Sequence, residues 1–513
     1  MNGCGITNVH DAPIGDIGPQ QKKHLFRAAE ATNLSFLRLT MDVTESAYAA
    51  GKKRCYQSNA VRRILLLLRI FCEATISALS SEGDMSAVKK DLAISEVRSL
   101  HAKLDWRILP FLLVCYTFAN LDKINVGFAK LQMQNDLRFS DAVYGLGAGI
   151  FFLGYVLFEI PSNLLMPRIG ARKTISRVMI LWGLASASMM FVHNDTSFYV
   201  TRFLLGVFEA GFAPGMIFYL TYWYGPKRMA QVTAIVMLAG PIAGIVGGPA
   251  STWLITHLNG NAGLSGWQWM FMFEGLPCVV LGLLSLVVLS DRPSDAKWLS
   301  LEEQNVLATQ LASPSQRHHV FSTVARDPRI YLMAASYFCI ICGIFTVSFW
   351  LPAILKSDGV TDTMHIGYYS MIPYVFTAVA MYLIGRRSDR VGERRLHSAI
   401  PAILGAAALA AATMSSGHLA LSLIFMSLAT AMIWCAYTVF WAIPPQYLKG
   451  SAAAGGIALI NTIGSFGGFF SPTIIGWAHT ATGSMAAGLY VMVAITVLGA
   501  LLLFANKIPK RNA

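Results

Sequence analysis

Charged residues are scarce in this sequence. Only 13% of its 513 residues are Asp, Glu, Lys or Arg, whereas 55% are hydrophobic. A soluble globular protein has about 25% charged residues. So low a share over so long a chain, with a mean hydropathy of +0.53, indicates a protein that is surrounded mostly by lipid rather than by water.

The sequence also lacks the motifs of several enzyme classes. It contains no G-x-x-x-x-G-K-[ST] loop for nucleotide phosphates and no H-E-x-x-H pair of zinc ligands. Its eight cysteines are scattered, and the C-x-x-C from Cys339 to Cys342 lies inside an apolar run. A redox or zinc site needs accessible thiolates and further ligands. We therefore expect no enzymatic activity, no catalytic residues, no metal and no cofactor, and we interpret the cysteines as packing residues.

Long apolar runs are abundant. A membrane-spanning helix needs about 20 mainly apolar residues, and from residue 106 onward the sequence has twelve such runs, divided into six and six by a polar segment, 291–329. We predict an all-α membrane protein with a six-helix N-terminal half, 105–290, a six-helix C-terminal half, 330–506, and a tail, 507–513. The twelve runs are 106–128, 143–165, 174–192, 198–221, 231–256, 269–290, 330–355, 366–385, 398–415, 419–441, 453–477 and 485–506.

The basic residues predict the orientation. The net charge is +13, but Lys and Arg occur in short clusters between the apolar runs, which fits membrane topology better than a nucleic-acid-binding face. After the first run, the loops on one side hold twenty of them, and those on the other side hold three, Lys130, Arg138 and Lys356. Because Lys and Arg accumulate on the cytoplasmic side, we predict a multi-pass cell-membrane protein with both termini in the cytoplasm and no nucleic-acid partner.

Residues 1–104 differ from the rest of the chain. They are polar and mixed, apart from an apolar run at 61–79 that Arg69 and Glu73 interrupt. We find no signal-peptide cleavage site. Two interpretations stay open: a disordered cytoplasmic tail with a short surface helix, or translation that starts at Met85 and makes the preceding residues a misassigned extension.

One loop occurs in two copies. NLLMPRIGARK, 163–173, and GRRSDRVGERR, 385–395, each join the second and third runs of a half. The aligned positions are Arg168 with Arg390, Gly170 with Gly392, and Arg172 with Arg394. Halves of the same orientation that share a loop motif are typical of one transporter architecture.

The second copy carries a complete G-x-x-x-D-R-x-G-x-R motif: Gly385, Asp389, Arg390, Gly392 and Arg394. Over residues 104–506 the sequence resembles the major facilitator superfamily. The resemblance implies a transporter whose two halves rock about a midplane site, with these loops as gating motifs. The first copy departs from the motif, with Pro167 in place of the acid and Asn163 in place of the first glycine. Nearby Glu159 is a candidate for the missing acid.

Other positions resemble the anion:cation symporter family, which carries organic acids with protons. In the first run, Asp122, Lys123 and Asn125 match its acid–base–x–Asn cluster, although its usual base is arginine. GWQWMFMFEGLP, 266–277, and Tyr155 ahead of an Ile-Pro pair also match. The fourth run matches R-x-x-x-G-x-x-E-A with Arg202, Gly206, Glu209 and Ala210. The resemblance implies proton-coupled uptake of an organic carboxylate, such as tartrate, a sugar acid or an aromatic acid, by a monomer in the lipid bilayer.

Four charged residues of the first half are candidates for charges embedded in the bilayer: Asp122, Lys123, Arg202 and Glu209. Each costs about 2.5–3.5 kcal/mol at the bilayer centre on insertion scales. One interpretation is a set of neutral structural ion pairs. The interpretation we favour is that Asp122 and Glu209 carry protons, while Lys123 and Arg202 bind the substrate anion. An anion that engages the base removes the cationic partner of the acid, which then takes up a proton.

The apolar runs of the second half contain no Asp, Glu, Lys or Arg, so we place proton coupling in the first half. Uncharged side chains would then complete the substrate site. The candidates are Asn461, Trp350, Trp434 and Tyr437 of the second half, with Asn125 and Tyr155 of the first. For each aromatic residue, packing or interfacial anchoring is the alternative. The role of Glu274 stays open.

Two other functions remain as alternatives. One is antiport or facilitated passage of another polar solute. However, GPIAGIVGGP, 240–249, lacks the last glycine of the antiporter motif G-P-x-x-G-G, and a hinge or helix packing is the better interpretation of its small residues. The other is a non-transporting membrane sensor, which would need an output domain that only residues 1–100 could supply.

Overall fold

The computed structural model describes residues 82–311, 326–444 and 451–506, and the regular elements within them are helices. The expectations for the chain up to residue 81 and for the tail, 507–513, lie outside these ranges.

The predicted fold class and its twelve spans are confirmed: twelve helical segments of the described chain are long and apolar enough to cross a membrane. Those of the first half are α4 (Glu82–Leu137), α5 (Asp141–Ile169), α6 (Ala171–Ser188), α7 (Asp195–Glu209) with α8 (Phe212–Thr221), α9 (Pro226–Met237) with α10 (Ala239–His257), and α11 (Gly266–Val288). Those of the second half are α14 (Pro328–Ser357), α15 (Thr363–Val391), α16 (Arg395–Met414), α17 (Leu419–Phe440), α18 (Ser451–Ser465) with α19 (Gly467–Thr482), and α20 (Ala486–Ala505).

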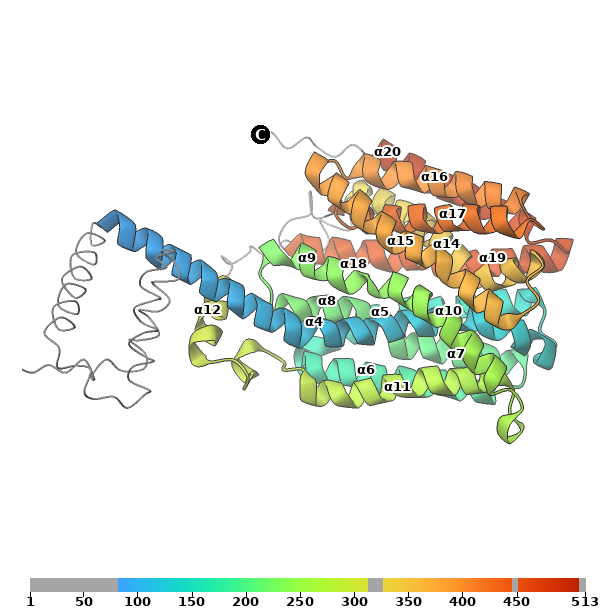
Figure 1. Ribbon diagram of the computed structural model, residues 1–513, viewed down its shortest axis with the longest axis horizontal. Helices are drawn as coiled ribbons and strands as arrows, with labels where there is room; N and C mark the ends of the chain where they lie inside the picture. Colours follow the sequence, from blue (N-terminus) through green and yellow to red (C-terminus); the bar gives the residue numbers. More distant parts are fainter. Residues whose placement is uncertain (1–81, 312–325, 445–450, 507–513) are drawn as a thin grey trace, which may run out of the picture. The chain divides into compact units, whose positions relative to one another are not determined.

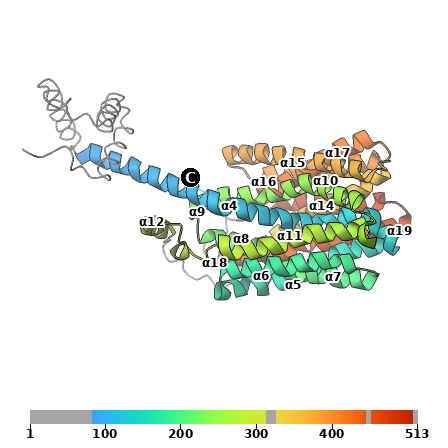
Figure 2. The ribbon, with the colours of Figure 1, turned by 60° about the horizontal axis from the view of Figure 1, so that its bottom comes forward.

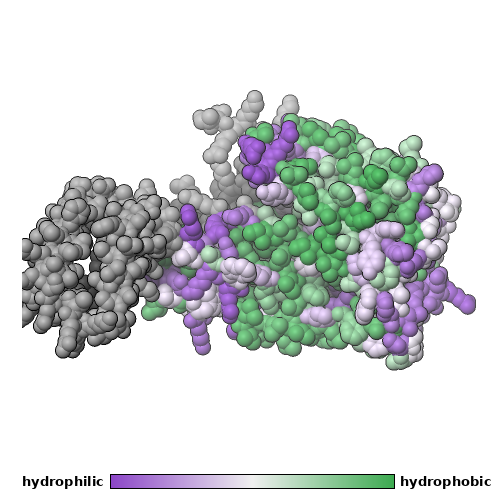
Figure 3. Space-filling view, viewed as in Figure 1, coloured by the Kyte–Doolittle hydropathy of each residue, from purple (hydrophilic) through white to green (hydrophobic). Residues whose placement is uncertain are grey.

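The surface of the helical bundle suits a lipid environment. Figure 3 shows hydrophobic residues over its middle and hydrophilic residues toward its two ends. Large apolar side chains such as Leu164, Phe376 and Val287 are 69%, 59% and 79% exposed. In water an apolar surface of this extent would promote association, whereas in a bilayer it lies against acyl chains.

The first span extends beyond its predicted limits. Hydropathy predicts 106–128, but α4 continues to Leu137 because the residues that follow contain no glycine or proline. Lys130, which we expected in a loop, therefore lies within the helix and is 6% exposed. The chain turns at Arg138, which has a φ of +57°, and Ser140 then caps the start of α5.

The fourth span is broken beside one of the predicted charged residues. α7 ends at Glu209 and α8 begins at Phe212, and between them Gly211 has a φ of +88°. This left-handed conformation is open to glycine and strained for other residues. The sequence EAGFAPG thus turns where hydropathy predicts one continuous span, and the turn leaves Glu209 at the carboxyl end of α7.

Two of the helix pairs that join the halves in the described structure pack closely at glycine residues. α5 packs against α19, and α10 packs against α15, as the two ribbon views show for the second pair (Figures 1 and 2). A Cβ atom at Gly145 of α5 would lie 2.3 Å from the Pro472 carbonyl oxygen, and one at Gly244 of α10 would lie 2.2 Å from the Tyr374 ring. Small residues therefore set the distance between the halves, and those of the 240–249 segment take part in this packing.

Between the halves, the described part of the polar segment forms a short helix, α12 (Leu301–Leu311). Lys103 Nζ of α4 lies 2.7 Å from Glu303 Oε2 of α12, which ties the segment to the first span. Both side chains are solvent-accessible, so this ion pair contributes at most about 1 kcal/mol.

Candidate functional site

A buried ion pair joins the first and fourth spans. Lys123 Nζ of α4 is in direct contact with Glu209 Oε1 of α7, and the two side chains are 12% and 1% exposed. The other carboxylate oxygen, Oε2, has no hydrogen-bond partner in the described structure. A buried charge that loses its partner is strongly destabilising, so the charged form of Glu209 depends chiefly on Lys123.

The helix break explains why Glu209 needs a cation. As the last residue of α7, it lies beside the carbonyl groups that a helix end leaves without intrahelical partners. The negative end of the helix dipole also disfavours a carboxylate at this place. Lys123 offsets both effects, and a group that draws Lys123 away therefore leaves Glu209 in surroundings that favour a bound proton.

Aromatic residues of both halves lie beside Lys123. Its Nζ is 5.6 Å from the Tyr155 ring centroid, which is within the range of a cation–π contact. Tyr437 of α17 is close enough to interact with the charge of Lys123, and its ring stacks on Tyr337 with 6.0 Å between centroids. Of the aromatic residues predicted to bind substrate, Tyr155 and Tyr437 are the two that the structure brings to this ion pair.

Glu159 of α5 connects the site to the second half. Its Oε1 accepts a hydrogen bond from Asn461 Nδ2 of α18 at 2.5 Å, and its Oε2 accepts one from Thr462 Oγ1 at 3.4 Å. The side chain is 4% exposed and interacts electrostatically with Lys123. Asn461, predicted to bind substrate, is thus linked to Lys123 through a carboxylate.

Asp122 faces away from that ion pair, toward the third span. The Ser186 hydroxyl of α6 donates to Asp122 Oδ1, and Asn125 Nδ2 donates to the same oxygen at 3.1 Å. Asp122 and Asn125 are each 1% exposed. Their remaining oxygens have no hydrogen-bond partner among the described residues. Neutral groups therefore hold this carboxylate, although it interacts electrostatically with Glu209 and Arg202.

A further acid, Glu274 of α11, lies near Asp122. Its Oε1 accepts a hydrogen bond from the Ser251 hydroxyl at 2.6 Å, and the side chain is 4% exposed. It interacts with Asn125 and with the charge of Asp122. These acids of the first half thus form two groups: Glu209 beside Lys123, and Asp122 beside Glu274.

Arg202 is fully buried, and the hydrogen bonds it makes go to the backbone. Its Nε donates to the Gly147 carbonyl at 3.2 Å and its Nη2 to the Ala148 carbonyl at 3.4 Å. The guanidinium carbon lies 5.0 Å from the Phe151 ring centroid, while Nη1 has no hydrogen-bond partner within the described chain. Of the four embedded charges, for which mutual ion pairing is the alternative interpretation, Lys123 and Glu209 are therefore the two in direct contact in the described structure.

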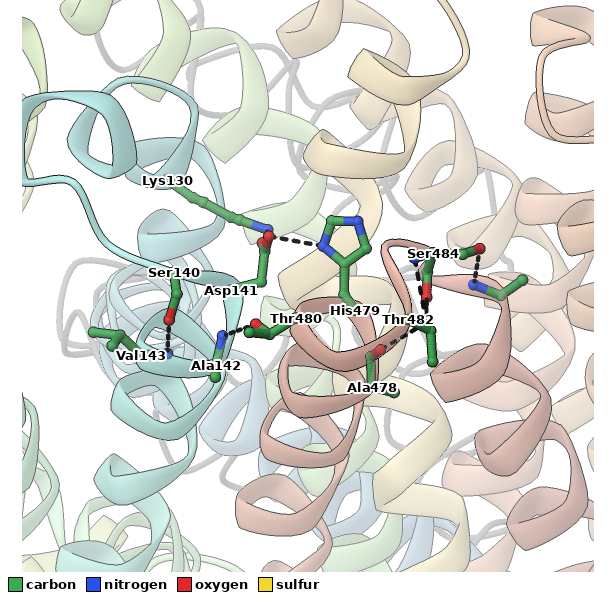
Figure 4. A network of polar contacts seen from close by, with 11 residues as sticks. Lys130, Ser140, Asp141, Ala142, Val143, Ala478, His479, Thr480, Thr482 and Ser484 are labelled. Carbon is green, nitrogen blue, oxygen red and sulfur yellow. Dashed lines mark hydrogen bonds and ion pairs between the residues drawn. The ribbon is translucent and has the colours of Figure 1, made fainter.

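A second polar network joins the halves where α5 begins, as Figure 4 shows. Lys130 Nζ lies 2.5 Å from Asp141 Oδ1, and His479 Nδ1 of α19 lies 2.7 Å from Asp141 Oδ2. The Ala142 N–H also donates to the Thr480 hydroxyl at 2.9 Å. We call Lys130, Asp141 and His479 the Asp141 network. It links a cation and an acid of the first half to a ring of the second.

Two tryptophans that the sequence offers as substrate contacts pack against other residues in the described structure. Trp350 is fully buried, and its ring centroid lies 3.9 Å from Lys130 Nζ, so it belongs to the surroundings of the Asp141 network. Trp434 packs on α10, where a Cβ atom at Gly240 would lie 2.4 Å from its ring. Trp434 also meets Tyr437 edge to face at 5.5 Å, so it supports a residue that lies beside Lys123.

In the second copy of the loop motif, the acid of the motif itself forms the ion pair that closes the turn. Arg394 forms an ion pair with Asp389, and Gly392 ends α15 with a φ of +73°. Gly385 lies in open space, and Arg390 is exposed. The turn therefore depends on one glycine and one ion pair of the motif.

The first copy takes its acid from another loop. The backbone N–H of Arg172 donates to Asp291 Oδ1 at 2.8 Å, and Asp291 lies just after the sixth span. Gly170 has a φ of +91°, and a Cβ atom there would lie 2.7 Å from the same oxygen. Arg168 is exposed. Asp291 thus supplies the contact that Pro167 cannot, and Glu159, which we had offered for this role, binds Asn461 instead.

Several residues of these contacts were not assigned to the proton or substrate site from the sequence, among them Glu159, Asp141 and His479. Glu159 is an acid within an apolar run, and the argument that identified Glu209 would have identified it too. Asp141 and His479 stand at the ends of runs, where polar residues are ordinary. No sequence signal pairs them, because they come from different halves.

Comparisons with known proteins agree with this architecture. The family model of the Major Facilitator Superfamily matches residues 112–472. A protein of Pseudomonas putida named "Putative metabolite transport protein NicT" is 42% identical over 412 residues, which cover 80% of this chain and 94% of that protein. A protein of Agrobacterium vitis named "Putative tartrate transporter" is 44% identical over 415 residues, which cover 80% of this chain and 92% of that protein.

A solved structure supports the fold. The crystal structure of a bacterial homologue of the human lysosomal transporter Spinster, in an inward-facing and occupied conformation, matches with a TM-score of 0.65 at 15% identity. The match covers 78% of this chain and 96% of that one. Twelve spans in two halves, a loop motif in both halves and the family match lead to one conclusion: this chain belongs to the major facilitator superfamily and is a multi-pass membrane transporter.

Proposed function

We propose that this protein imports an organic carboxylate together with protons, by exposing a central site alternately to the two sides of a cell membrane. The observation that carries the proposal is the buried contact between Lys123 and Glu209, in which one cation serves an acid with no other hydrogen-bond partner in the described structure. The names of two relatives, a metabolite transport protein and a tartrate transporter, support an organic acid as the substrate.

Charge balance couples the two solutes. In the resting pair, the positive charge of Lys123 and the negative charge of Glu209 cancel. A substrate carboxylate that binds Lys123 neutralises the positive charge of Lys123 in place of Glu209. Glu209 is then left without a cation at a helix end that disfavours an anion, and it takes up a proton. The site is again neutral, so the loaded carrier can close without burying a net charge.

A second proton site would serve a substrate with more than one negative charge. Asp122 is the candidate, because it is buried among neutral donors and interacts electrostatically with both Glu209 and Arg202. Arg202 adds a buried cation whose Nη1 is unpartnered within the described chain. One proton per monoanion makes transport electroneutral, whereas two make it electrogenic.

The basic loops orient the carrier. The loops that hold Arg172 and Arg394 would face the cytoplasm, as would both termini. Asp141 then lies at the outer end of α5. Glu159 lies about 27 Å further along that helix, toward the cytoplasm. The Asp141 network would therefore close the outer side, and the contact of Glu159 with Asn461 would close the inner side.

Proton uptake by proteoliposomes tests the proposal. The purified carrier is offered tartrate, sugar acids, hydroxyphenylacetate and phthalate, with neutral sugars as controls. We expect the medium to become alkaline with at least one acid, and this signal to disappear in Glu209→Gln although the variant still folds. Uptake of a neutral control without proton movement, with no response to any acid, would contradict symport and favour the facilitator alternative. Acidification on addition of an acid would instead favour antiport.

A further inference from the structure

The contact between Glu159 and the second half has the chemistry of a bound carboxylate. Asn461 Nδ2 and Thr462 Oγ1 donate to separate oxygens of the one side chain, at 2.5 Å and 3.4 Å. Hydrogen bonds to a charged acceptor are stronger than those between neutral groups. Asn461 is itself positioned by the Tyr337 hydroxyl, which donates to its Oδ1 at 3.4 Å. The second half thus presents two oriented donors to one carboxylate.

The partners of Glu159 are the groups that a substrate carboxylate needs. Lys123, the cation of the proposed site, interacts with the charges of both Glu159 and Glu209. The apolar runs of the second half contain no Asp, Glu, Lys or Arg. Asn461 and Thr462 therefore obtain an anionic acceptor either from the first half or from the substrate.

We infer that Glu159 stands in for the substrate carboxylate on Asn461 and Thr462, and that this allows the carrier to change sides without substrate. The inference rests on the proposed function. A symporter must return unloaded, and buried donors that lose their acceptor destabilise the closed arrangement. The substrate supplies that acceptor in the loaded carrier, and Glu159 supplies it in the unloaded one.

The alternative is that Glu159 forms a purely structural contact between the halves. Such a contact stabilises the joined halves whatever the ligand, so its removal changes the affinity for all ligands alike. If Glu159 instead replaces the substrate carboxylate, it competes with carboxylates alone. Its removal then frees Asn461 and Thr462 to bind an acid, and it leaves the unloaded carrier without the acceptor that its closed arrangement needs.

Binding to the purified full-length protein separates these cases. The probes are the carboxylate that the proteoliposome panel selects and its uncharged methyl ester. If Glu159 holds the donors for about nine-tenths of the time, Glu159→Ala binds the acid about tenfold more tightly. The affinity for the ester stays as in the wild type. The side chain of Glu159→Gln keeps one neutral acceptor oxygen, so the affinity of this variant for the acid falls between those of the wild type and Glu159→Ala. An unchanged affinity for the acid, or an equal change for acid and ester, overturns the inference.

Transport assays test the second consequence. In proteoliposomes, Glu159→Ala should lose net uptake by about tenfold, yet keep exchange of labelled substrate when substrate is present on both sides. Asn461→Ala should lose both activities, because the substrate needs that donor. Glu302→Ala, which removes an exposed acid from α12, should keep both. Full net uptake by Glu159→Ala overturns the inference, as does loss of exchange together with uptake.

These outcomes also distinguish the inference from the proposed function. If the wild type neither binds nor moves any acid of the panel, both fail. If the wild type transports an acid and the Glu159 variants behave like it, the inference alone fails. Gel filtration reports folding, and should the Ala variant aggregate, Glu159→Gln, which conserves the size of the side chain, carries the same test.

Discussion

Three buried charges of the first half are held by three different kinds of group. Glu209 has a cation, Asp122 has a hydroxyl and an amide, and Arg202 has backbone carbonyls. Neutral donors favour the charged form of an acid less than a cation in direct contact does. Of these side chains, Glu209 is therefore the one whose protonation a bound anion can control.

Removing one partner of the ion pair should be worse than removing both. Lys123→Met leaves Glu209 buried without its cation, which costs about 3 kcal/mol of stability. Lys123→Met combined with Glu209→Gln leaves no unpaired charge and should recover most of that loss. The midpoint of thermal unfolding of the purified variants measures both effects. A double variant less stable than Lys123→Met would show that the pair is not a coupled unit.

For single residues, the sequence predicts which charged side chains are buried better than it predicts their partners. Lys123 and Glu209 were identified because a charge within an apolar run is expensive. Their mutual contact, and the turn of Asp122 toward Ser186, depend on how each helix is rotated about its axis. The contact of Glu159 with Asn461 depends on the packing of two halves that are far apart in sequence.

Among the helices, the fourth span is the element that positions the site. Its break lets Glu209 end one helix, and Gly211 makes the turn with a φ of +88°. Gly211→Ala should destabilise the protein by about 1–3 kcal/mol, since that conformation is strained for alanine and the new Cβ would lie 2.8 Å from Ser162.

A matched control is Gly225→Ala. Gly225 has a φ of −69°, and its added Cβ would make an ordinary contact at 3.6 Å. The stability of Gly225→Ala should stay within about 0.5 kcal/mol of the wild type. Chemical denaturation followed by intrinsic fluorescence compares the two. Equal stability of both variants would contradict the strain assigned to the break.

Hydropathy identified the spans because a lipid-exposed segment must be both apolar and helical. It did not locate the break in the fourth span, since EAGFAPG stays apolar while the backbone turns. It also ended the first span too early, because Lys130 reads as a loop residue until its partner, Asp141, is known. Hydropathy thus predicts which segments span the membrane, whereas the ends and turns of the helices depend on individual residues.

In the whole transporter, two of the polar contacts that join the halves within the described residues lie at different depths along α5. One is the contact of Glu159 with Asn461, and the other is the Asp141 network. Alternating access requires each to open while the other stays closed. The two contacts therefore set the balance between conformations that open to opposite sides.

Weakening the Asp141 network should favour opening at that end. His479→Ala removes the contribution of the second half and keeps the ion pair of Lys130 with Asp141. Spin labels at Asp195 and Ala481, which are exposed, report the separation of the halves in a background free of native cysteines. We expect the ratio of long to short distances to rise about fivefold. An unchanged ratio would show that the network does not act as a gate.

The most direct test is to count the protons that enter the protein when substrate binds. Purified carrier in weakly buffered detergent solution near neutral pH is titrated with the selected acid, and a pH indicator is read at saturation. We predict about one proton taken up for each carboxylate that binds Lys123. Glu209→Gln should bind the acid and take up at least one proton fewer. Binding without proton uptake in the wild type, or the same uptake in Glu209→Gln, would contradict coupling through the Lys123–Glu209 pair.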